Sequence, residues 1–115
     1  MTRDPDCLFC KVVADEVPAD VVHRGERVVA FRDVNPRAPL HVLVVPVEHH
    51  VDVGALAAAD AGLLADVVRT AAAIAADEAD GEFRLVFNTG RQAGQSVFHV
   101  HGHVLGGRSL GWPPG

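Results

Sequence analysis

The sequence predicts one α+β domain over residues 1–115, built on an antiparallel sheet of about five strands with one long helix and a short N-terminal helix. Apolar residues alternate with period two in segments on both sides of a single stretch of helical spacing. No strand-helix-strand unit is repeated, which argues against a parallel sheet. With 115 residues, 49% of them hydrophobic, the chain can form one ordinary core.

The first half of the chain predicts a short helix and a hairpin. Leu8 to Ala14 fit a helix that ends before Pro18, because the residue before a proline is disfavoured in helical geometry. Arg27 to Val34 alternate as a strand does and stop at Pro36. The valine-rich segment His41 to Val45 reads as a buried strand. We expect these two strands to pair.

The second half predicts a long helix followed by another hairpin. Asp60 to Glu78 place apolar residues at helical spacing, with Asp60 suited to cap the helix. Phe83 to Asn88 alternate as a strand, and Gly90 to Gly94 form a loop. Val97 to Leu105 then resume the alternation of a strand.

Charge and cysteine usage restrict the environment and partners. A net charge of -5 repels polyanions, so nucleic acids and acidic membranes are poor partners. The N-terminal segment has no apolar stretch behind basic residues, and we expect a cytoplasmic protein. Cys7 and Cys10 are the two cysteines, and their spacing in a reducing compartment indicates a metal clip or a redox pair before a structural disulfide.

Three histidines carry the strongest chemical signal. His99, His101 and His103 are two residues apart, so on a strand they would face the same side. Titratable groups gathered in this way are typical of functional sites. Neutral imidazole can attack phosphorus as a nucleophile, or it can bind zinc that activates water. Spacing alone leaves both options open. The glycine-containing loop from Asn88 to Ser96 could direct N–H groups at a phosphate, although it is not a Walker A loop.

Several motifs together resemble the histidine triad nucleotide-binding proteins. The resemblance covers the chain from about Cys7 to its last residue, and the tail is most similar to the purine nucleoside phosphoramidase branch. Gly102 departs from it, since the family usually has a bulky apolar residue there, which puts the rigidity of the strand in doubt. The motifs are Asp33-Val34-Asn35-Pro36, Ala38-Pro39 with His41, Gly94-Gln95-Ser96 leading to His99-Val100-His101-Gly102-His103, and Trp112-Pro113-Pro114-Gly115.

The resemblance implies catalytic roles. His101 would be the nucleophile that attacks the α-phosphorus, oriented by the backbone around His99. His103 would bind a phosphate oxygen, and Ser96 would form a hydrogen bond with the departing group. His41 is expected to support these residues from behind.

The resemblance also implies a substrate site for a purine nucleotide. Asp33 would bind the ribose hydroxyls, with Phe31 and Val34 beside the base, although Phe31 could equally be a core residue and Asp33 a turn residue. Asn88 and the Gly94 amide would complete the phosphate pocket. The remaining expected substrate contacts come from the same motifs and are Gln95, Ser96, His101, His103 and Trp112.

A structural zinc site is the third implication. In zinc-bearing members of the family a Cys-x-x-Cys pair and two histidines are the ligands, which correspond here to Cys7, Cys10, His49 and His99. His50 is adjacent and could replace His49. The alternative is a redox pair or two partly buried thiols.

The resemblance therefore predicts a homodimeric hydrolase or transferase of nucleoside 5′-phosphoramidates that works through a nucleotidyl-histidine. Three alternatives remain at this point. The chain could hydrolyse dinucleoside polyphosphates, it could be a zinc hydrolase with the triad as ligands, or it could sense nucleotides with little catalysis.

Overall fold

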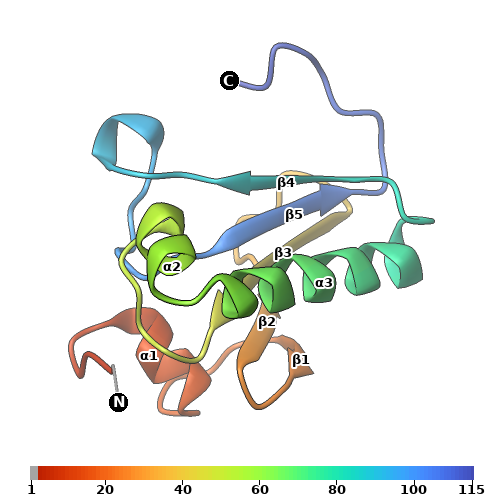
Figure 1. Ribbon diagram of the computed structural model, residues 1–115. Coiled ribbons are helices and arrows are strands. Elements are labelled where there is room, and N and C mark those ends of the chain that lie inside the picture. The colour runs from red at the N-terminus through yellow and green to blue at the C-terminus, as the bar shows by residue number, and fades with distance from the viewer. Residues whose placement is uncertain (1–2) are drawn as a thin grey trace.

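The computed structural model describes residues 3–115, and in that part of the chain it contains one five-stranded antiparallel sheet with helices on both faces (Figure 1). The strand order is β1-β2-β3-β5-β4. The α+β prediction is confirmed. The elements are α1 (Leu8–Val13), β1 (Val21–Arg24), β2 (Val28–Arg32), β3 (Leu40–Pro46), α2 (Val53–Ala59), α3 (Ala61–Glu78), β4 (Phe83–Phe87), the 3-10 turn η1 (Arg91–Ala93) and β5 (Gly102–Gly106).

Both predicted hairpins are present, whereas two short elements were not predicted. β2 pairs with β3, and β4 pairs with β5. β1 has four residues, too few to establish an alternating pattern. α2 reads VGALAAA, in which a single large side chain, Leu56, is buried, so no helical period is visible.

The strand expected over Val97 to Leu105 is wrong for its first half. β5 begins only at Gly102, which pairs with Val44 of β3. Further along β3, Pro46 has no N–H to donate to a ladder. The Val100 N–H instead donates to the His50 carbonyl at 2.7 Å. The segment before β5 is therefore held by side-chain and loop contacts, and of the three histidines only His103 is a strand residue.

Apolar side chains form one core on each face of the sheet. On one face α2 and α3 pack against residues such as Val42, Val44 and Val104. On the other face α1 packs its Phe9 and Val12 against neighbours that include Leu43. Successive strand residues point to opposite faces, so the alternation in the sequence assigns each residue to one of the two cores.

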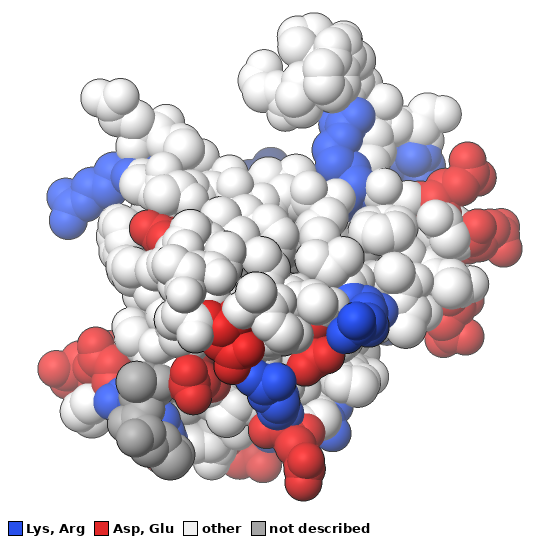
Figure 2. Space-filling view, in the orientation of Figure 1, with Lys and Arg blue, Asp and Glu red and all other residues white. Residues whose placement is uncertain are grey.

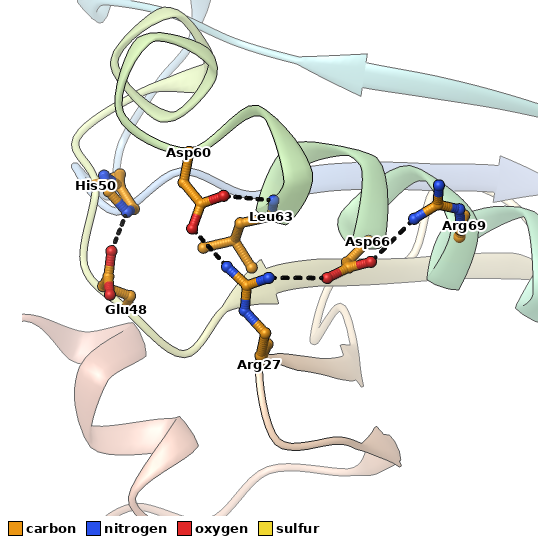
Figure 3. A network of polar contacts seen from close by, with 7 residues as sticks. All are labelled: Arg27, Glu48, His50, Asp60, Leu63, Asp66 and Arg69. Atoms are coloured by element: carbon orange, nitrogen blue, oxygen red, sulfur yellow. Dashed lines mark hydrogen bonds and ion pairs between the residues drawn. The ribbon is translucent and has the colours of Figure 1, made fainter.

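Asp60 caps α3, as predicted, and joins an ion-pair network that fixes the helix over the sheet (Figure 3). Its carboxylate accepts from the Leu63 N–H at 3.0 Å and also binds Arg27, which precedes β2. Arg27 reaches Asp66 at 3.2 Å, and Arg69 binds the same aspartate. Such exposed pairs each contribute at most about 1 kcal/mol, so they orient α3 rather than stabilise it strongly.

Side chains of β4 pack closely against Gly102. A Cβ atom there would lie 2.9 Å from Leu85 Cδ1 and 3.1 Å from the Phe87 ring, which is closer than side chains pack. The two β4 side chains therefore occupy the space that a larger residue would take. Because that space is filled, glycine leaves no gap on this side of β5.

The surface mixes both signs of charge. On the face drawn in Figure 2, acidic and basic side chains lie among neutral ones. Over the described residues, no helix is both long and apolar enough to cross a membrane.

Candidate functional site

Two cysteines and two histidines meet where α1 approaches the histidine segment; we call Cys7, Cys10, His49 and His99 the Cys₂His₂ cluster. The Cys7 Sγ lies 3.3 Å and the Cys10 Sγ 3.5 Å from His99 Nδ1, which is 3.2 Å from His49 Nδ1. His99 Nε2 is 2.8 Å from the Pro46 carbonyl, which only accepts, so Nε2 carries the proton. The Nδ1 lone pair therefore faces the cluster.

The Cys₂His₂ cluster fits zinc. Zn–S bonds of about 2.3 Å and Zn–N bonds of about 2.0 Å in a tetrahedron put sulfur and nitrogen roughly 3.5 Å apart, as these side chains are. Burial lowers the pKa of His99 to about 4, which keeps the ring neutral and able to bind a cation. His49, and not His50, belongs to the cluster, because His50 pairs with Glu48 at 2.8 Å.

A second group of possible ligands, Asp33, His41 and His103, is better described as a hydrogen-bond relay. The Arg37 N–H donates to His41 Nδ1 at 2.9 Å, so neutral His41 carries its proton on Nε2. That nitrogen lies 3.0 Å from His103 Nδ1 and 3.3 Å from the Asp33 carboxylate. A proton on the inward-facing nitrogen blocks metal binding, so these residues form a relay rather than a metal site.

His101 and His103 present opposite atoms at the site. His101 Nδ1 donates to the His99 carbonyl at 2.8 Å, which leaves a lone pair on Nε2. When His41 donates to His103 Nδ1, the His103 proton resides on Nε2 instead. Burial lowers the pKa of His101, and burial together with His101 and His41 lowers that of His103 to about 4. Both rings are thus neutral at pH 7, one an acceptor and the other a donor.

These two rings line a cavity of about 700 Å³. Four further predicted site residues line it together with Val97, namely Phe31, Asp33, Val34 and Ser96. The other wall was missed by sequence reasoning and comes from α1 and the segment that follows it. The signal that could have revealed this wall is the set of apolar residues in the predicted helix beside the cysteine pair. That wall consists of Leu8, Phe9, Val12, Val17, Pro18, Ala19 and Asp20, with Arg32 and Leu43 also contributing.

Other predicted substrate contacts lie outside the lining of this cavity. The buried Gln95 gives its side chain to the backbone, accepting from Gly90 and donating to Val51. Asn88 lies beside Gly94, whose φ of +95° suits glycine. Trp112 is 82% exposed in the tail, with the Arg84 guanidinium 5.9 Å from its ring.

The fold and these residues define a small α+β protein with a histidine-lined cavity beside a Cys₂His₂ cluster. A family model described as the HIT domain matches residues 14–110, and the chain belongs to this family. The match includes His41, His49 and the three histidines expected from the sequence, so the predicted resemblance is confirmed.

Two curated relatives and two solved structures place the chain further. It is 39% identical to a 14 kDa zinc-binding protein of Brassica juncea (96% of this chain, 100% of the relative) and 38% identical to an adenylylsulfatase of Arabidopsis thaliana (97% and 78%). A HIT family hydrolase of Legionella pneumophila has a TM-score of 0.91 at 43% identity (96% and 100%). A zinc-bound histidine triad protein of Mycobacterium smegmatis has a TM-score of 0.75 at 32% identity (90% and 76%).

Proposed function

We propose that this chain is a hydrolase or transferase that acts at the α-phosphorus of purine nucleoside 5′-phosphoramidates. The observation that carries the proposal is that His101 and His103 line one cavity, with His101 Nδ1 2.8 Å from the His99 carbonyl and His103 Nδ1 3.0 Å from His41 Nε2. From these contacts we assign an Nε2 lone pair to His101 and an Nε2 proton to His103. A nucleophile needs a lone pair such as that of His101 Nε2, and a proton such as that on His103 Nε2 stabilises a phosphate oxygen that gains charge.

The reaction has two displacements. His101 Nε2 attacks the α-phosphorus and the phosphorus–nitrogen bond of the substrate breaks. The departing nitrogen takes a proton from solvent water and leaves as an amine. Ser96 lines the cavity and is proposed to donate a hydrogen bond to that group. Water then attacks phosphorus, releases its proton to solvent and displaces His101, which gives a nucleoside monophosphate. If another acceptor attacks in place of water, the product is the nucleotidylated acceptor. His103 holds a phosphate oxygen throughout, and the His99 carbonyl maintains the His101 tautomer.

The cavity lining supports recognition of a nucleoside. Asp33 is half-buried there and can accept hydrogen bonds from the ribose 2′- and 3′-hydroxyls. Phe31 and Val34 are proposed to flank the purine, and Asn88 with the Gly94 amide to bind phosphate. A net charge of -5 gives no general attraction for phosphate, so affinity must come from this fitted site.

The Cys₂His₂ cluster is proposed to hold a structural zinc ion. The donor set and spacing support this, and two relatives carry zinc in their names. Zinc would cross-link α1 to the segment around His99, whereas the proposed attack on phosphorus is made by His101. A zinc hydrolase that uses the whole triad as ligands is disfavoured, because His101 and His103 lie outside the cluster.

We further propose a cytoplasmic homodimer of single-domain chains. β4 is an edge strand of the sheet, and its sequence FRLVF is largely apolar. An apolar edge strand with unpaired backbone groups is suited to pairing with a second chain.

Substrate preference tests the proposal. We expect adenosine 5′-phosphoramidate to exceed diadenosine polyphosphates in kcat/KM by at least ~tenfold, since the tail of the chain resembles the phosphoramidase branch of the family. Steady-state kinetics with both substrates and with adenylyl sulfate, the substrate class suggested by the Arabidopsis relative's name, would measure this. Equal or reversed efficiency would move the chain to the dinucleotide hydrolases. Asp33→Ala should remove the preference for ribose over 2′-deoxyribose.

A further inference from the structure

The Cys₂His₂ cluster is connected to the His101 ring in two ways. The first is His99, whose side chain belongs to the cluster while its carbonyl accepts the His101 Nδ1–H at 2.8 Å. The second is α1, whose Cys7 caps the helix and whose Cys10 lies one turn further on. The cluster and the cavity therefore share both a backbone segment and a helix.

Phe9 lies between the two cysteines and faces the cavity. Its ring meets His101 edge to face, with centroids 4.9 Å apart and an interplanar angle of 88°. It also meets Phe31, a proposed base contact, at 5.3 Å. Phe9 is 6% exposed and lines the cavity, so its position shapes the space for a nucleotide as well as the setting of His101.

The helix that carries Phe9 depends on external anchors. α1 has six residues, far fewer than the roughly 12–15 at which isolated helices become even marginal in water. Its anchors are the packing of Phe9, Cys10 and Val12 and the side chains of the cluster. A metal held by four side chains would fix both ends of the Cys7–Cys10 turn, and with them the Phe9 ring.

We propose that Phe9 is a positioning residue that couples metal binding in the Cys₂His₂ cluster to nucleotide binding in the cavity. With the cluster loaded, Phe9 is held against His101 and Phe31, and the nucleotide meets a preformed wall. Without metal, binding the nucleotide must also order α1. This inference rests on the proposed function, because it requires a nucleotide in the cavity.

Coupling of this kind is reciprocal. If zinc strengthens nucleotide binding by some factor, the nucleotide strengthens zinc binding by the same factor. We expect roughly tenfold, within the usual range of such couplings. The effect can be measured as retention of zinc, independently of any turnover.

The experiment compares the zinc dissociation constant with and without saturating adenosine 5′-monophosphate. The zinc-loaded chain is titrated with a colorimetric chelator, and calorimetry measures nucleotide binding in parallel. The wild type should hold zinc roughly tenfold more tightly with the nucleotide. Phe9→Leu should keep zinc but reduce the coupling factor to below about threefold. Phe83→Leu, the same change on the opposite face of the sheet, should keep the full factor.

The possible outcomes of this experiment test the proposed function, the coupling and the role of Phe9 separately. No nucleotide binding in calorimetry would contradict the proposed function itself. Nucleotide binding with unchanged zinc affinity, or a chain that holds no zinc, would overturn the coupling while leaving the function intact. Full coupling in Phe9→Leu would assign the link to the His99 carbonyl and remove Phe9 from it. The wild-type comparison decides whether the two sites are coupled at all. If Phe9→Leu folds poorly, Phe9→Met replaces it as the variant that tests the role of Phe9, with the same expected loss of coupling.

Discussion

The Cys₂His₂ cluster and the relay gather similar side chains, yet they are suited to different tasks. In the first, the outer nitrogen of His99 donates to a carbonyl, so the inner nitrogen offers a lone pair. In the relay, the outer nitrogen of His41 accepts from the Arg37 N–H, so the inner nitrogen carries a proton. The hydrogen bond on the far side of an imidazole therefore determines whether its inner nitrogen offers a lone pair or carries a proton.

Removing the cysteines should give the largest effect. Cys7→Ser with Cys10→Ser should abolish binding of the expected one zinc per chain and lower Tm on the order of 15 °C, because a ligand at a thousand times its Kd stabilises by about 4 kcal/mol. Elemental analysis and thermal denaturation measure the two quantities.

The matched change in the relay is His41→Gln. It should lower turnover and leave the zinc content unchanged, since the relay is assigned no metal. A second zinc ion per chain that disappears in His41→Gln would remove the distinction between the two groups.

A smaller effect is expected at Gly102, which lies between the histidines that line the cavity. Gly102→Leu should destabilise the chain by about 1–3 kcal/mol, because its side chain would overlap the Phe87 ring. Phe87→Val should recover part of this loss by removing the ring. Denaturant unfolding of both single variants and the double variant measures their coupling. Strictly additive losses would contradict the packing described here.

The smallest effect concerns protonation of the relay. Burial, with His101 and His41 nearby, lowers the pKa of His103 to about 4 from an ordinary value of about 6.5. The folded ring should therefore stay neutral as pH falls from 7 to 5, while the unfolded chain takes up a proton. This difference makes the free energy of unfolding fall over that window. NMR titration of the His103 ring should give a midpoint well below 6, and a midpoint near 6.5 would exclude the buried relay.

The sequence was most informative where local periodicity or a compact motif decides the outcome. β2, α3 and β4 follow from periodicity, β3 follows from its valine-rich composition, and the cysteine pair with His49 and His99 follows from the family resemblance. The alternating pattern did not predict that His99 belongs to the Cys₂His₂ cluster while His101 and His103 line the cavity, because it assumed one continuous strand through all three histidines. Long-range contacts with Pro46 and His50 hold that segment instead. The α1 wall was missed for a similar reason, since its role depends on packing across the sheet.

The most direct test of the account is turnover by His101→Ala. In the proposed mechanism, His101 Nε2 is the attacking nitrogen. His103 is not expected to replace it, because its Nδ1 accepts from His41 and its Nε2 carries the proton. The variant should bind adenosine 5′-monophosphate within about tenfold of the wild type, roughly 1.4 kcal/mol. It should hydrolyse adenosine 5′-phosphoramidate more than about a thousandfold more slowly. Retention of a tenth or more of the wild-type rate would contradict the covalent mechanism.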